Sequence, residues 1–184
     1  MKYFIPLVLT LGITASLWAY PPAKATVRLT PSGAYPIGTL GKVFVAGGGV
    51  LLDTSWHDVA IPNFSLGVQT GCWYFAGQEG KAEWAAMVPL FATMRYEVPL
   101  SYEWILLPGI SVGMTYTVGS FTDRYKEEVT RAAFHLAYGA GLMLEYRVSH
   151  DFGVVVGGDC VLLYEPAGLI LFAHAQAGVY WRFR

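Results

Sequence analysis

Apolar and polar residues alternate along several stretches of the chain. From Phe134 to Tyr146 every second residue is apolar, and the residues between them, Met143 apart, are small or polar. The same alternation recurs from Leu169 to Phe183. Because successive side chains of a β-strand point to opposite faces, each stretch predicts a strand with one apolar and one polar face. Along the whole chain the pattern predicts eight strands, at about residues 25–35, 43–52, 63–75, 85–97, 103–117, 132–147, 151–164 and 169–183.

Aromatic residues stand at both ends of the predicted apolar faces. Pairs of them are separated by 10 or 12 positions, an even number, so that both rings of a pair point to the same side. Twelve residues of a strand tilted by about 40° span roughly 30 Å, close to the ~25 Å apolar band of a membrane barrel and its aromatic girdles. The predicted girdle consists of Phe64, Tyr74, Trp84, Tyr96, Trp104, Tyr116, Phe134, Tyr146, Phe152 and Tyr164.

The composition points to the same environment. Of the 184 residues, 54% are hydrophobic and only 14% are charged, against roughly 25% in soluble domains. After the N-terminal segment no apolar run reaches the length of about 18 residues that a membrane helix requires. A closed barrel is the other structure that satisfies all backbone groups in lipid. We therefore expect an all-β fold, an eight-stranded antiparallel up-and-down transmembrane β-barrel; a secreted soluble barrel with its apolar face inward is the main alternative.

The N-terminus has the features of a secretory signal peptide. Lys2 precedes an apolar stretch at residues 3–18, and Pro21-Pro22 follows. The expected signal peptide covers residues 1–19, with cleavage as late as residue 25 if Ala23-Lys24-Ala25 is the site, and residues 26–184 form the barrel. A retained N-terminal anchor helix is the alternative.

Polar side chains of the predicted strands face the barrel interior. An eight-stranded barrel has room only for side chains or one small ligand, and opposite charges there should pair. The interior is either a polar core that closes the barrel or a gated path or ligand pocket. By strand parity the inward set comprises Arg28, Gln69, Arg95, Glu97, Glu145, Arg147, Asp159, His174, Gln176 and Arg182.

The connections between predicted strands alternate in length. Residues 98–102 and 148–150 are short enough for periplasmic turns, whereas residues 118–131 and 76–84 form longer outer loops. Residues 53–62 form a periplasmic link that is longer than usual. Cys72 and Cys160 lie on the apolar faces of two strands that are not neighbours, so we expect free thiols in contact with lipid.

Residue patterns for catalysis or cofactors are missing from the sequence. The 12 basic and 13 acidic residues provide no electrostatic footprint for nucleic acid. The four histidines show no metal-ligand spacing and no H-x-S arrangement, and Gly47-Gly48-Gly49 lacks the Lys-Ser/Thr of a phosphate loop. We therefore expect no enzymatic activity, no cofactor, no metal and no nucleic-acid partner.

The C-terminus resembles the terminal assembly signal of bacterial outer-membrane proteins. Its polar, glycine and aromatic positions are Gln176, Gly178, Trp181 and Phe183, followed by one extra residue, Arg184. Stretches at residues 35–38, 63–67, 88–90 and 95–100 are similar to those of small OmpA/OmpX/OmpW-like barrels. The resemblance implies a monomer in the bacterial cell outer membrane, with membrane lipid and, during biogenesis, the barrel-assembly machinery as partners. It further implies passive, porin-like passage of small molecules, apolar ones included; the alternative is an adhesin or structural envelope barrel with a plugged lumen, which binds host ligands through its outer loops.

Overall fold

The computed structural model describes residues 25–38, 40–78, 82–122, 128–165 and 168–183. The strands are β1 (Ala25–Ile37), β2 (Phe44–His57), β3 (Phe64–Gly77), β4 (Ala82–Tyr96), β5 (Val98–Pro99), β6 (Trp104–Thr122), β7 (Glu128–Arg147), β8 (Phe152–Glu165) and β9 (Gly168–Phe183), with a 3-10 turn, η1 (Leu40–Lys42), after β1. Within these ranges we find no helix with the length and apolar character needed to cross a membrane. The expected signal peptide lies outside the described residues.

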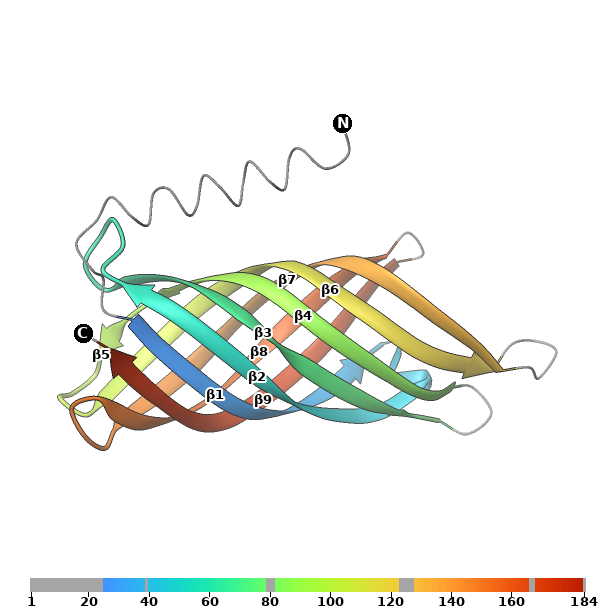
Figure 1. Cartoon of the computed structure of the whole chain (residues 1–184), viewed down its shortest axis with the longest axis horizontal. Helices are drawn as coiled ribbons and strands as arrows, with labels where there is room; N and C mark the ends of the chain where they lie inside the picture. The colour runs from blue at the N-terminus through green and yellow to red at the C-terminus, as the bar shows by residue number, and fades with distance from the viewer. Residues whose placement is uncertain (1–24, 39, 79–81, 123–127, 166–167, 184) are drawn as a thin grey trace.

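The strands close into a single antiparallel barrel (Figure 1). Each long strand pairs with its neighbours in the chain, and β1 pairs with β9 to close the wall. β4 pairs directly with β6 in the wall, and the two-residue strand β5 only adds a short pairing with β6 beside the end of β4. Without β5, the wall contains eight long strands. The expected fold class is confirmed. The end of the barrel that carries Ala25 and Phe183 is called the terminal end, and the opposite end the distal end.

Side chains alternate between the two faces of the wall. Large apolar residues such as Leu90, Ile110 and Phe134 are exposed on the outside, and Phe134 has a relative exposure of 69%. Most polar residues of the same strands are buried inside. Because water-soluble monomers rarely expose contiguous apolar surface on this scale, the outer wall is suited to lipid. The alternative of a soluble barrel whose apolar face points inward is therefore not supported.

Several strands are longer than the sequence predicted. β2 continues to His57, so the expected long link at residues 53–62 is a short turn at residues 58–63. β6 and β7 extend into the expected loop at residues 118–131, of which residues 123–127 lie outside the described part of the chain. The expected loop at residues 76–84 is likewise shortened by β3 and β4. The inward positions near the strand ends are polar and therefore resemble loop residues in composition. For this reason the sequence analysis placed the strand ends too early.

Candidate functional site: the barrel interior

A network of buried charges crosses the interior near the terminal end. Arg28 on β1 has no solvent-exposed surface. Its guanidinium donates to Asp53 on β2 at 2.8 Å, to the Ser55 hydroxyl at 2.7 Å and to Glu145 on β7 at 2.7 Å. Since β1 and β7 are not adjacent in the wall, the contact with Glu145 spans the lumen.

Two further arginines extend this network. Arg95 on β4 donates to both carboxylate oxygens of Asp53, at 2.8 and 3.0 Å. Arg182 on β9 lies 3.0 Å from the Glu145 carboxylate and 3.5 Å from that of Glu97. We call these six residues, Arg28, Arg95, Arg182, Asp53, Glu97 and Glu145, the ion network. Its three positive and three negative charges balance, as burial of ionised groups requires.

Thr26, His57 and Glu97 are connected like the members of a catalytic triad. His57 Nδ1 contacts the Glu97 carboxylate, and its Nε2 lies 2.6 Å from the Thr26 hydroxyl. A nucleophile must also reach a substrate, but Thr26 is completely buried. The arrangement therefore ties the start of β1 and the end of β2 to the segment after β4.

The electrostatic environment of Glu97 follows from these contacts. Glu97 lies beyond the last residue of β4, at the terminal end of the barrel. Burial alone would raise the pKa of its carboxyl, but the hydrogen bond and charge of His57 and the charge of Arg182 outweigh it. The pKa of Glu97 is therefore held below its ordinary value.

A second polar layer lies on the distal side of the ion network. Asp159 contacts His174 Nδ1 at 2.8 Å, and the His174 ring packs against Trp73 with the ring centres 4.2 Å apart. The indole of Trp73 donates to the Ser32 hydroxyl at 2.7 Å. Thr30 donates to the Gln176 side chain at 2.9 Å.

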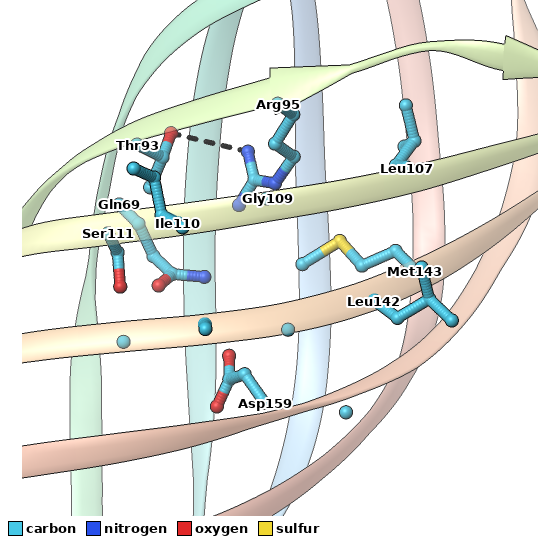
Figure 2. A pocket seen from close by; sticks show the side chains of 14 residues that line it. Gln69, Thr93, Arg95, Leu107, Gly109, Ile110, Ser111, Leu142, Met143 and Asp159 are labelled. Atoms are coloured by element: carbon cyan, nitrogen blue, oxygen red, sulfur yellow. Dashed lines mark hydrogen bonds between the residues drawn. The ribbon is translucent and has the colours of Figure 1, made fainter.

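A small void adjoins this layer. Figure 2 shows the side chains of Gln69, Arg95 and Asp159 around it. Its volume of about 20 Å³ is enough for roughly one water molecule.

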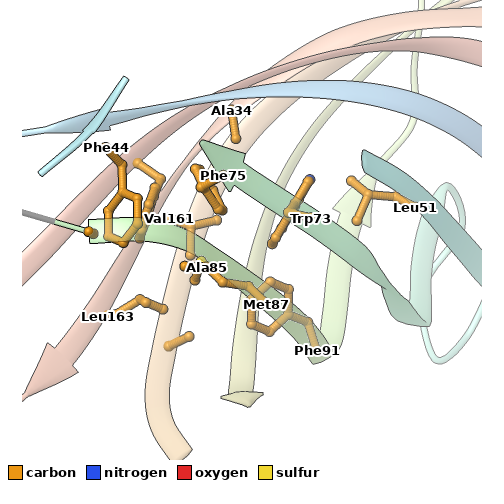
Figure 3. Packing of buried hydrophobic residues seen from close by; sticks show 13 residues of the cluster. Ala34, Phe44, Leu51, Trp73, Phe75, Ala85, Met87, Phe91, Val161 and Leu163 are labelled. Atoms are coloured by element: carbon orange, nitrogen blue, oxygen red, sulfur yellow. The ribbon is translucent and has the colours of Figure 1, made fainter. Parts of the chain in front are cut away.

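The distal half of the interior is filled with apolar side chains (Figure 3). Phe75 packs against Phe44 and Phe172, with ring centres 6.3 and 5.3 Å away. Trp73 and Leu163 belong to the same buried cluster. Among the described residues, charged groups thus lie in the terminal part of the interior, polar groups in its middle and aromatic rings in its distal half.

Glycines allow large side chains to fit into this narrow space. Gly109 on β6 faces Arg95 in register, and a Cβ at Gly109 would lie 2.7 Å from Arg95 Cγ. Gly141 on β7 faces Asp159, and its Cβ would lie 2.4 Å from Asp159 Cβ. Both distances are shorter than van der Waals contact. The wall therefore has a glycine at each of these positions, where the neighbouring strand projects a polar side chain inward.

The structure places the ten residues expected inside on the inner face of the wall. It brings five of them into the ion network and pairs Asp159 with His174, while Gln69 lines the void and Gln176 contacts Thr30. Arg147 stands apart from the network. Sequence reasoning missed Asp53, Ser55 and His57, because β2 was expected to end at residue 52. The signal was the alternation itself, which continues through His57.

The aromatic residues of the expected girdle lie on the outer wall and meet across strands. Ring centres are 4.7 Å apart for Trp104 and Tyr146, and 4.9 Å for Tyr116 and Phe134. Other contacts join Tyr74 with Trp84 and Phe152 with Trp181, and Phe64 is paired with Tyr96 in register, while Tyr164 is exposed.

The C-terminal motif is divided between the two faces of β9. Trp181 and Phe183 are exposed on the outside, and Gln176 is buried inside. At Gly178 a Cβ would lie 2.1 Å from the Leu29 carbonyl oxygen, so the close approach of β1 excludes a side chain. The two cysteines, Cys72 and Cys160, are free and exposed, in agreement with the expectation from strand parity.

Comparisons with known proteins show similarity at the level of the fold. No protein-family model matches the chain, and no curated protein sequence is significantly similar to it. The crystal structure of Neisserial surface protein A is 12% identical, with a TM-score of 0.62, and the match covers 86% of this chain and 97% of that chain. The attachment invasion locus protein Ail of Yersinia pestis is 13% identical, with a TM-score of 0.62 and coverage of 89% and 100%.

A third solved structure extends the range of organisms. A major outer membrane protein from Thermus thermophilus is 15% identical, with a TM-score of 0.53 and coverage of 86% and 99%. At these identities the similarity concerns the fold. The chain has the fold of the small eight-stranded outer-membrane barrels.

Proposed function

We propose that this protein is an integral barrel of the bacterial outer membrane, closed along its axis, that acts at the cell surface through its distal end. The terminal end would then face the periplasm. The apolar outer wall, its two levels of aromatic residues and the fold of its structural neighbours support the location.

The observation that carries the closed state is the ion network. Arg28 and Glu145 are each 0% exposed and hold one another across the lumen at 2.7 Å. A solute that follows the axis must separate such pairs, and breaking a buried pair costs about 3–5 kcal/mol. It must then displace the packed rings of Phe75 and Phe172. Both barriers favour a structural plug over an open pore.

A surface role is supported by the shape of the distal end. β7 pairs with β6 from Glu128 onward, but with β8 only from Leu136, so the β6–β7 hairpin projects beyond its neighbour. Figure 1 shows this hairpin reaching farthest at the distal end. Two structural neighbours are described as a surface protein and an attachment invasion locus protein, which is compatible with attachment through such a hairpin.

Biogenesis would follow from the C-terminal motif. We infer that Trp181 and Phe183, exposed on the last strand, are available to the barrel-assembly machinery, whereas Gln176 and Gly178 face into the closed wall. A monomer is sufficient for this role, because the wall closes within one chain.

Purified barrel in liposomes tests the proposal. We expect no flux of small polar or apolar solutes above that of empty vesicles. Cells that display the protein should bind a host-cell or matrix surface, and shortening the hairpin at residues 118–131 should abolish binding. Solute flux through the wild-type barrel would overturn the closed state. Passive passage of small molecules, the function implied by the family resemblance, remains a prediction that the same assay decides.

A further inference from the structure

The small void inside the barrel lies where the wall carries few side chains. On the inner face of β6 and β7, Gly109 is paired with Gly141 and Ser111 with Gly139, and all four residues line the void. Three of the four have no side chain, so space remains beside this part of the wall.

Two polar side chains at the void lack a hydrogen-bond partner among the described residues. Gln69 on β3 is 3% exposed, and no acceptor binds its Nε2. Asp159 on β8 has its Oδ1 2.8 Å from His174 Nδ1, but this contact does not have the geometry of a hydrogen bond. Figure 2 shows the Gln69 and Asp159 side chains around the void. Because buried polar groups without partners are costly and rare, each of these two groups requires a partner.

The size and the charges of the lining limit what can bind. A volume of about 20 Å³ holds one molecule of the size of water. The guanidinium of Arg95 also lines the void and disfavours a cation, whereas the carboxylate of Asp159 disfavours an anion. The two unpartnered groups are one donor and one acceptor, so the ligand must be neutral and must both accept and donate a hydrogen bond.

We propose that the void binds one water molecule, which accepts a hydrogen bond from Gln69 Nε2 and donates one to Asp159 Oδ1. β3 and β8 are not neighbours in the wall, so this water links two strands across the lumen. A bound water that joins two buried polar groups stabilises them nearly as well as a direct hydrogen bond. The site depends on the interior alone and is independent of the proposed attachment at the distal end.

Nuclear magnetic resonance of the full chain in lipid nanodiscs tests this site. We expect a nuclear Overhauser cross-peak between water and the Gln69 side-chain amide, with the sign of a long-lived bound water. Ser111→Val should abolish this cross-peak, because the larger side chain fills the void. The matched control is Ser111→Ala, which removes the same hydroxyl without filling the void and should keep the cross-peak.

Each result decides for or against the bound water. Absence of the cross-peak in the wild type, or its survival in Ser111→Val, would overturn the site. Loss of the cross-peak in Ser111→Ala would assign the signal to the hydroxyl proton of Ser111 and would also overturn it. A crystal structure of the wild type provides a second test that does not require any variant to fold. We expect one density peak within hydrogen-bond distance of Gln69 Nε2 and Asp159 Oδ1, and anomalous signal there after a rubidium or bromide soak would replace the water by an ion.

Discussion

Neutralising Glu145 is the sharpest test of the ion network. Glu145 accepts hydrogen bonds from Arg28 at 2.7 Å and from Arg182 at 3.0 Å, and none of its surface reaches solvent. Glu145→Gln keeps the size of the side chain but leaves the network with three positive and two negative charges. Removing one partner of a buried pair costs about 3–5 kcal/mol of unfolding free energy, because the remaining charge stays desolvated.

The measurement is urea unfolding of the barrel in vesicles, followed by tryptophan fluorescence. With a urea dependence of about 2 kcal/mol per molar, this loss lowers the midpoint by about 2 M. The control Glu103→Gln, at an exposed acid of the same barrel end, should stay within about 0.5 kcal/mol of wild type.

A double variant separates charge balance from side-chain loss. Arg28→Met with Glu145→Leu removes one charge of each sign and leaves Arg95 with Asp53 and Arg182 with Glu97. Since replacement of a whole buried pair by apolar residues is often nearly neutral, we expect the double variant to lie closer to wild type than Glu145→Gln, with a coupling energy above about 2 kcal/mol. Additive losses, or a cost below about 1 kcal/mol for Glu145→Gln, would refute the reasoning.

Three other outcomes follow from the same structure. The pKa of Glu97 is lower in the folded protein than in the unfolded chain, so its carboxylate stabilises the fold above the unfolded pKa, and this stabilisation is lost as the pH falls through the folded pKa. The unfolding free energy of Glu97→Gln should therefore decrease less on acidification than that of the wild type. Equal decreases would contradict this prediction. Gly109→Ala should destabilise the barrel by about 1–3 kcal/mol, because its methyl group would clash with Arg95. The control Gly33→Ala should be tolerated, since a Cβ at Gly33 has no neighbour within 4 Å. Equal urea midpoints for the two variants would argue against tight packing at Gly109. Cys72 and Cys160 should resist a water-soluble maleimide in intact membranes and react after denaturation without reductant, and a disulfide between them would disprove the strand register.

The fold was predictable because one physical rule acts on almost every residue. A strand with lipid on one side and a packed interior on the other keeps its outward positions apolar, and every second residue of 134–146 and of 169–183 is apolar. The rule also placed Arg28, Glu145 and Arg182 inside. It failed at Asp53, Ser55 and His57, where the inward face is polar at every position and has the composition of a turn.

The partners within the interior could not be predicted in the same way. Arg28 and Glu145 are 117 positions apart on strands that are not neighbours, so their contact depends on how far each strand is shifted along the barrel. That shift is a property of the closed wall and is not encoded in any one strand. For the same reason no sequence pattern indicated that Arg147 would lie outside the ion network while Arg182, on another strand, would bind two carboxylates.

The balanced charges of the ion network also constrain how this barrel can diverge. A change at Arg28, Asp53 or Glu145 alone leaves an orphaned charge in the interior, so lineages should rarely retain such single changes. Compensated changes, in which an arginine and its carboxylate are replaced together, avoid that intermediate loss. Among homologues, positions 28, 53, 95, 97, 145 and 182 should therefore vary as a group, and the network should be recognisable as correlated substitution even where none of its residues is kept.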